Sequence, residues 1–229
     1  MKIVFHLGKR SPDYRTLMRE QSDFEVDGRV IKVNSLVIAE QTHSNLVHVC
    51  TEKDSGAGLG VKPQISIADG FVTNIPDQFL LIRTADCTPV IMYDPVKMVV
   101  AAVHSGREGT RKNIAGEACR IMNQAFNCDS SDIIAYIGAG ICHKHYEVSE
   151  AVFEEYNASL LAMDIHPVIS LHRHIDIRSG IFQQLIRSGI PFKNIENIFD
   201  CTYEDDNYHS YRREGSHNRQ INLVGIVYE

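Results

Sequence analysis

Four short, dense apolar runs in the middle of the chain constrain its fold more than any other feature. Each run is bounded by Asp, Pro, Asn or Lys. Short apolar runs between turn-forming residues are typical of buried strands. The sequence therefore predicts adjacent buried strands of one sheet at Gly70–Thr73, Phe79–Arg83, Val90–Tyr93 and Met98–Val103.

Helical and strand-like patterns intermix along the rest of the chain. We expect helices at Ile114–Phe126, Ser149–Leu161 and Gly180–Arg187. We expect further strands at Val30–Ile38, Leu46–Val49, Ile133–Ile137, His172–Ile177 and Ile221–Val227. Because no repeat or linker interrupts this mixture, we predict a single α/β (mixed α+β) domain over residues 1–229, with a mixed β-sheet flanked by helices.

Length and composition agree with an ordinary globular protein. The chain has 229 residues, of which 44% are hydrophobic and 23% charged, enough to bury a sizeable core. No stretch approaches the roughly 20 apolar residues of a membrane span, and the N-terminal residues lack the pattern of a signal peptide. We therefore expect a cytoplasmic protein with no membrane partner.

Charge and cysteine content narrow the choice of partners. Lys plus Arg is 23 and Asp plus Glu is 29, so the net charge is −6, and Arg212 and Arg213 form the one basic pair. This balance disfavours a nucleic-acid partner but permits a local pocket for a small anion. The six cysteines lack the tight spacing of a disulfide scaffold, so we expect reduced thiols.

Metal-capable side chains follow two of the predicted strands. Cys87 comes shortly after the run Phe79–Arg83, and His104 directly follows the run Met98–Val103. His43 lies between two strand-like segments, at an expected turn. Together they would make a first shell for Zn²⁺ that leaves a position for water or substrate. The same spacing also suits a metal-free cysteine nucleophile activated by His104.

A series of short motifs runs from about residue 30 to the end of the chain. In order, they are Gln41–His43, Ala68–Thr73, Thr84–Val90, Ala102–Gly106, Ile137–Ile141, Tyr146–Val148, His174–Ile177 and Tyr208–Arg213. They resemble the successive motifs of the polyphenol oxidase (laccase-type) family of bacterial proteins. Members of that family are also described as purine nucleoside phosphorylases.

The resemblance implies a metal and a reaction. By its motifs, His43, Cys87 and His104 would bind zinc at the ends of strands. The implied function is a zinc-dependent purine nucleoside phosphorylase that acts on adenosine, inosine and methylthioadenosine, with adenosine deaminase activity. Its partners would then be a small nucleoside and phosphate. The alternatives are a copper-dependent polyphenol oxidase (laccase) and a metal-free cysteine hydrolase that uses Cys87 and His104.

Other residues in the motifs are candidates for catalysis and substrate binding. Asp86, beside the cysteine, is the candidate base for deamination. Arg212 is the candidate for phosphate, because a guanidinium grips phosphate through paired hydrogen bonds. Gln41, Asp69 and Asp176 are the remaining predicted substrate-binding residues.

The chain departs from the family pattern in two places. Arg107-Glu108-Gly109 stands where members usually have Trp-Arg-Gly, so Arg107 would have to replace an arginine. The N-terminal part, residues 1–29, is abbreviated. Cys142 or His48 could supply a fourth metal ligand. The two His-x-His pairs, at residues 143 and 145 and at 172 and 174, are too few for a multicopper centre.

Overall fold

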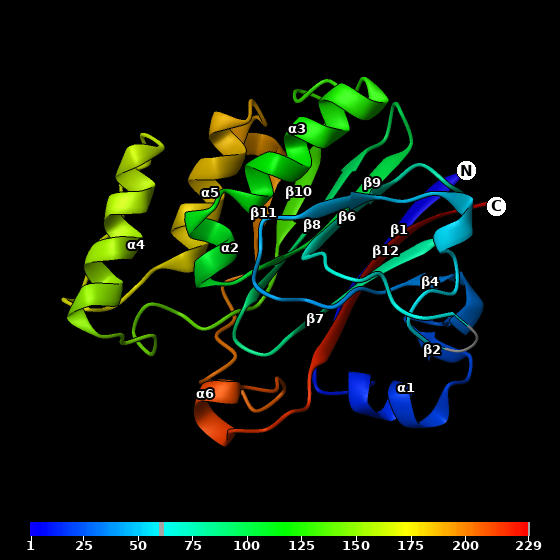
Figure 1. Ribbon diagram of the computed structural model, residues 1–229, viewed down its shortest axis with the longest axis horizontal. Coiled ribbons are helices and arrows are strands. Elements are labelled where there is room, and N and C mark those ends of the chain that lie inside the picture. Colours follow the sequence, from blue (N-terminus) through cyan, green and yellow to red (C-terminus); the bar gives the residue numbers. More distant parts are fainter. Residues whose placement is uncertain (60–61, 229) are drawn as a thin grey trace.

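Two packed β-sheets form the centre of the computed structural model, which describes residues 1–59 and 62–228 (Figure 1). The first sheet has the order β1 (Lys2–Leu7), β12 (Gln220–Val227), β7 (Phe79–Thr84), β4 (Leu36–Val37). The second has the order β11 (Ile195–Asn197), β10 (Ile134–Ile137), β8 (Thr88–Asp94), β9 (Val99–Ser105), β6 (Gly70–Thr73), β5 (Val47–Val49). Strands β2 (Phe24–Val26) and β3 (Arg29–Ile31) pair with each other. Both main sheets mix parallel and antiparallel pairs, as predicted.

The helices flank these sheets and confirm the predicted fold class. They are α1 (Tyr14–Glu20), α2 (Arg107–Arg111), α3 (Ile114–Phe126), α4 (Glu150–Ala162), α5 (Ile177–Arg187) and α6 (Tyr211–Glu214). Short 3₁₀ turns lie at Val33–Ser35, Glu52–Asp54 and Phe192–Asn194. Figure 1 shows α2 to α5 gathered on one side of the sheets. None of the helices in the described residues is both long and apolar enough to cross a membrane.

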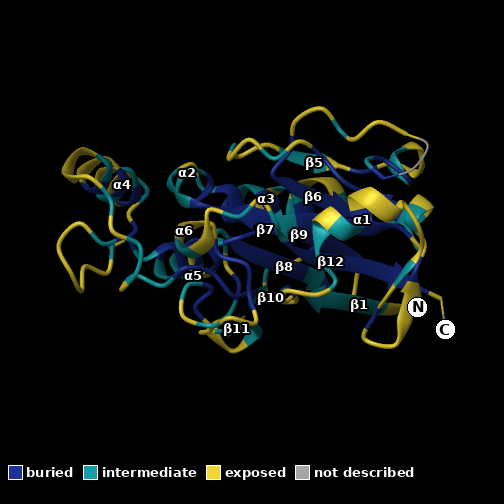
Figure 2. Cartoon of the chain, turned by 90° about the horizontal axis from the view of Figure 1, so that it is seen from below, coloured by how far each residue is buried: buried dark blue, intermediate teal, exposed yellow. Residues whose placement is uncertain are grey.

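Apolar side chains cover both faces of the central strands. On β7, Leu80 and Ile82 pack between the two sheets, whereas Leu81 packs on the outer face of the first sheet. On the helix side of the second sheet, Met92 of β8 shares a cluster with Met122 of α3. Figure 2 shows the strands mostly in dark blue, with exposed residues on the outer helices and loops. This burial on both faces explains why the sequence shows continuous apolar runs rather than alternation.

One detail of the predicted sheet is wrong. The four apolar runs all form strands, but β7 belongs to the first sheet while β6, β8 and β9 belong to the second. The chain crosses from one sheet to the other between Thr84 and Thr88. An apolar run indicates burial, and the apolar residues of β7 are as buried as those of β6, β8 and β9, so the pattern could not assign the runs to different sheets.

One further predicted strand is wrong and another is interrupted. The segment His172–Ile177 contains no strand, because the Asp176 side chain accepts a hydrogen bond from the Ser179 backbone N–H and begins α5 at Ile177. The segment Val30–Ile38 is broken between β3 and β4 by a 3₁₀ turn, where Asp23 accepts the Val33 N–H. In both places a side-chain carboxylate accepts a backbone N–H where the helical turn begins, from three residues away at Asp176 and from ten residues away at Asp23.

The packing between the sheets should contribute strongly to stability. Phe71 of β6 is fully buried in that layer. We expect Phe71→Ala to lower the free energy of unfolding by about 3–5 kcal/mol, because it leaves a cavity in a closely packed core. The matched control Phe199→Ala removes a ring that is 80% exposed and should change stability by less than about 0.5 kcal/mol. Urea unfolding of the two variants measures the difference, and equal losses would contradict this account of the core.

Candidate metal centre

The structure brings His43, Cys87 and His104 together. Each offers one ligand atom, and these atoms all lie within 4.8 Å of one another. The Cys87 sulfur is 3.7 Å from His43 Nε2, and the two imidazole rings are 4.9 Å apart at their centroids. This set of one thiolate and two imidazoles is able to hold a metal ion.

The site lies where the chain changes sheets. Cys87 occupies the turn between β7 and β8, in which Asp86 has a left-handed backbone (φ 82°). His104 lies on β9, opposite Pro89 of β8, and so faces the same end of the second sheet. His43 comes from the loop between β4 and β5 and also has a positive φ (61°). Three separate segments of the chain therefore meet at one end of the β8 and β9 strands.

Asp69, predicted to bind substrate, instead holds the two histidines. Its buried carboxylate accepts hydrogen bonds from the backbone N–H groups of Thr42, His43 and Ser44. It also accepts one from His104 Nδ1 at 2.8 Å, which leaves the Nε2 atom of that ring for the site. Burial raises the pKa of Asp69, but the hydrogen bonds from His104 and Ser44 outweigh it and bring the pKa to about 2. A partner of this kind fixes the orientation of a metal-binding imidazole.

Gly106 leaves room for the cysteine. A Cβ at this position would lie 2.6 Å from the Cys87 sulfur and 3.2 Å from His43 Cδ2. Any side chain there would displace a predicted metal ligand. The glycine after the fourth motif's histidine is thus explained by contact distance rather than by backbone freedom.

The charges of the cluster favour a thiolate. Burial raises the pKa of Cys87, but the imidazoles of His104 and His43 outweigh it and lower the pKa to about 6. Burial lowers the pKa of His104, but the thiolate and Asp69 outweigh it and raise that pKa to about 9. The thiolate is the form that binds metal and the form that acts as a nucleophile.

Neither residue suggested as a fourth ligand lies in this cluster. His48 pairs with Asp54 at 3.2 Å, and Cys142 lies beside His145, 3.3 Å from its Nδ1 atom. Among the described residues, the cluster therefore contains three protein donors. Three donors are typical of catalytic zinc sites, and a thiolate with two imidazoles also suits copper.

A cavity of about 780 Å³ opens over the cluster and is lined by four arginines. They are Arg83, Arg107, Arg212 and Arg219. Arg83 and Arg219 are not among the residues predicted from the sequence, although a lone cation within the apolar run of β7 is a signal for Arg83. Tyr14, Tyr146 and Tyr211 also line the wall. The cavity thus combines positive charge with aromatic surface, which suits an anion and a flat ring system.

Asp86 and Gln41 line the cavity but are engaged by protein partners. Asp86 accepts hydrogen bonds from Thr202 Oγ1 and from the Arg212 backbone N–H, each at 2.7 Å. The Gln41 amide donates to the Arg83 carbonyl and accepts from the Arg83 N–H, both at 2.9 Å. In this arrangement they position the arginines.

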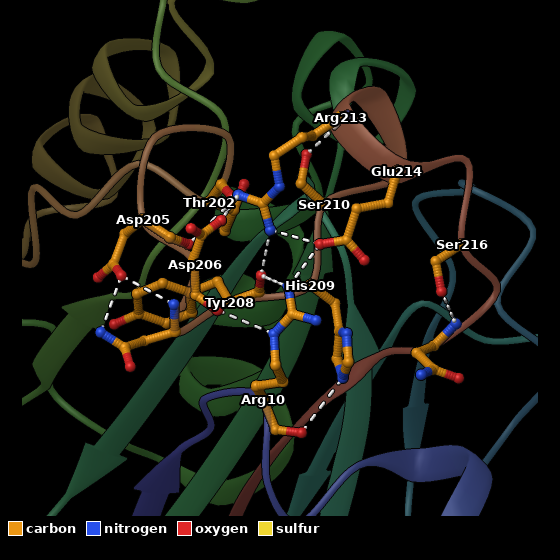
Figure 3. A network of polar contacts seen from close by, with 12 residues as sticks. Arg10, Thr202, Asp205, Asp206, Tyr208, His209, Ser210, Arg213, Glu214 and Ser216 are labelled. Atoms are coloured by element: carbon orange, nitrogen blue, oxygen red, sulfur yellow. Dashed lines mark hydrogen bonds and ion pairs between the residues drawn. The ribbon is translucent and has the colours of Figure 1, made fainter.

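The adjacent arginines Arg212 and Arg213 have different roles. The Arg213 guanidinium donates to the carbonyls of Thr202, Tyr203 and Tyr208, as part of the network in Figure 3. It thereby fixes the loop that leads into α6. The Arg212 guanidinium lies 5.3 Å from the Tyr146 ring centroid and lines the cavity.

The departure at Arg107-Glu108 places a cation, not an anion, in the cavity wall. Arg107 lines the cavity. Glu108 accepts hydrogen bonds from Arg107 Nε at 3.1 Å and from Arg111 Nε at 2.7 Å. Burial raises the pKa of Glu108, but these two arginines outweigh it and lower the pKa. The negative charge is therefore compensated within α2.

Asp176 and the paired histidines lie elsewhere. Asp176 caps α5, and its other carboxylate oxygen is 3.8 Å from His143. His145 stacks on Tyr203, and His172 pairs with Glu150. Among the described residues, neither Asp176 nor these histidines belong to the cavity wall.

We expect Asp69→Asn to weaken metal binding by about 10–100-fold, because an amide cannot accept all the hydrogen bonds that orient His43 and His104. Asp94→Asn is the matched control, since Asp94 is equally buried and accepts the N–H groups of Val96 and Lys97 far from the cluster. Zinc affinity measured by chelator competition compares the two variants. Equal affinities would show that Asp69 does not position the ligands.

Comparison with known proteins agrees with these features. Residues 5–227 match the family described as multi-copper polyphenol oxidoreductase laccase. The chain is 31% identical to a purine nucleoside phosphorylase of Corynebacterium glutamicum, over 98% of this chain and 88% of the relative. It is 30% identical to the purine nucleoside phosphorylase YlmD of Bacillus subtilis, over 85% and 72%. The solved structure of the Bacillus licheniformis hypothetical protein YfiH matches with a TM-score of 0.78 and 29% identity, over 85% and 75%. The chain therefore belongs to the multi-copper polyphenol oxidoreductase laccase family.

Proposed function

We propose that this protein is a zinc-dependent purine nucleoside phosphorylase that acts on adenosine, inosine and methylthioadenosine, with adenosine deamination as a second activity. The observation that supports it most is the union, in one cavity, of the His43, Cys87 and His104 cluster with four arginines. The names of the relatives in Corynebacterium glutamicum and Bacillus subtilis point to the same reaction. The cytoplasmic location is part of this proposal, since the cysteines are free thiols.

The chemistry of phosphorolysis matches the residues present. A phosphate oxygen forms a bond to C1′ of the ribose while the bond from C1′ to the purine nitrogen breaks. The electron pair leaves with the purine, which takes up a proton. Zinc held by His43, Cys87 and His104 would supply Lewis-acid stabilisation of negative charge.

The cavity residues would bind and orient the two substrates. Arg212 and the other arginines of the cavity wall would hold phosphate, since guanidinium groups bind phosphate through paired hydrogen bonds. Tyr146 and Tyr211 offer ring surfaces on which a purine can stack. Burial raises the pKa of Tyr146, so its hydroxyl keeps its proton and can donate a hydrogen bond to the substrate. For deamination, Asp86 remains the candidate base, and its two hydrogen bonds hold it at the cavity wall.

Two alternatives each rest on a specific observation. The thiolate of Cys87 beside a protonated His104 is the pair expected of a cysteine hydrolase. The same donors, and the family description, suit a copper-dependent polyphenol oxidase. The hydrolase would survive a chelator and lose activity to alkylation, whereas the oxidase would need copper and oxygen.

We expect the purified protein to release free purine from inosine, adenosine and methylthioadenosine only when phosphate is present, and to convert adenosine to inosine without it. Removal of the metal by a chelator, or the substitution Cys87→Ser, should lower the rates of phosphorolysis and of deamination at least about tenfold. The control Cys50→Ser alters a buried thiol outside the cavity and should keep activity. Chromatography of the products tests this, and absence of purine release would refute the phosphorylase reaction.

Arg212→Ala should raise the KM for phosphate by roughly 10–100-fold and leave the KM for inosine nearly unchanged, because a hydrogen bond to a charged group contributes about 1.5–3 kcal/mol. The control Arg187→Ala removes an arginine that pairs with Asp164 on the surface. Steady-state kinetics with phosphate and inosine varied in turn separates the two constants. A change confined to the KM for inosine would assign Arg212 to the nucleoside instead.

A further inference from the structure

A second cluster of metal-capable side chains lies outside the cavity. Cys142 and His145 belong to the segment after β10, and Cys201 and Glu204 to the segment after β11. Their ligand atoms, which are two sulfurs, an imidazole nitrogen and a carboxylate oxygen, all lie within 4.8 Å of one another. Four protein donors are typical of structural zinc sites, whereas the three donors around Cys87 are typical of catalytic ones.

The distances in this cluster are close to those of a tetrahedral zinc site. His145 Nδ1 lies 3.3 Å from the Cys142 sulfur, 3.8 Å from the Cys201 sulfur and 3.6 Å from Glu204 Oε1. With Zn–S of about 2.3 Å and Zn–N or Zn–O of about 2.0–2.1 Å, tetrahedral geometry separates sulfur from nitrogen by roughly 3.5 Å and nitrogen from oxygen by roughly 3.4 Å. One ion therefore fits between the four side chains with small adjustments.

Neighbouring groups support the ligands. The Cys142 backbone N–H donates to the Cys201 sulfur at 3.2 Å, a contact that favours a thiolate. The His145 ring stacks on Tyr203 with a centroid distance of 4.5 Å, which restricts its rotation. Such partners orient the ligands of a metal site before the ion binds.

The cluster joins two segments that both hold the turn containing Cys87. Next to Cys142, the Ile141 N–H donates to the Asp86 carbonyl at 2.8 Å. Next to Cys201, Thr202 Oγ1 donates to the Asp86 carboxylate at 2.7 Å. An ion bound to both segments would restrain Asp86 from two sides, and with it the adjacent Cys87.

We propose that Cys142, His145, Cys201 and Glu204 bind a second zinc ion, which has a structural role and cross-links the two segments that hold the Asp86-Cys87 turn. This site differs from the cluster of His43, Cys87 and His104 in its residues, its four protein donors and its position outside the cavity. It does not depend on which substrate the cavity accepts.

The zinc content of the full chain tests the proposal. The protein is produced with zinc, purified under a thiol reductant and analysed by mass spectrometry of the metal. Cys201→Ser and Cys142→Ser should each contain one zinc fewer than the wild type. Cys50→Ser is the matched control, because Cys50 is 5% exposed and Cys201 is 4% exposed. Its zinc content should equal that of the wild type. Cys87→Ser should keep the zinc that Cys201→Ser loses.

A substitution of the exposed ligand Glu204 tests the same site if a cysteine substitution prevents folding. The Glu204 side chain is 54% exposed, so Glu204→Gln should fold. We expect it to lower the zinc affinity of the second site by at least about tenfold in chelator competition. Equal zinc in Cys201→Ser and wild type, or a Cys142–Cys201 disulfide in the zinc-loaded protein, overturns the proposal. Because the readout is metal content, it is independent of nucleoside turnover.

Discussion

The rest of the candidate site depends on the hydrogen bonds that the buried carboxylate of Asp69 accepts. It collects backbone N–H groups from the loop of His43 and the Nδ1 atom of His104. A buried carboxylate without such donors would be costly, so the contacts stabilise one another. The loop between β4 and β5 is thereby tied to β9, and both imidazoles are aimed at Cys87.

The second constraint is the crossing of the chain from one sheet to the other. Because β7 and β8 lie in different sheets, the short turn between them must bend sharply, and Asp86 takes a left-handed backbone there. The turn is held by Ile141, Thr202 and the Arg212 backbone. The cysteine therefore owes its position to segments that follow it by more than fifty residues.

Positive charge in the cavity is kept accessible by different means. Gln41 and the Ala39 carbonyl hold Arg83, and the Tyr146 ring supports Arg212. The Arg213 guanidinium, by contrast, donates its hydrogen bonds to backbone carbonyls (Figure 3). The two adjacent arginines of one motif thus have different roles: Arg213 fixes the loop, and Arg212 lines the cavity.

The sequence by itself predicted the mixed α/β class and most of the buried strands, because apolar runs are a property of local sequence. It singled out His43, Cys87 and His104 as candidate metal ligands through their residue types and through the resemblance of their motifs to a known family. It did not show that β7 lies in a separate sheet, that Asp176 caps a helix or that Asp69 lies behind the histidines. Nor did it show that Arg213 fixes a loop through backbone carbonyls, or bring Cys142 and Cys201 together across 59 residues. Those outcomes depend on which groups meet in three dimensions. A carboxylate or guanidinium has the same local pattern whether its partner is a backbone N–H, a carbonyl or a substrate, and only the tertiary structure decides among them.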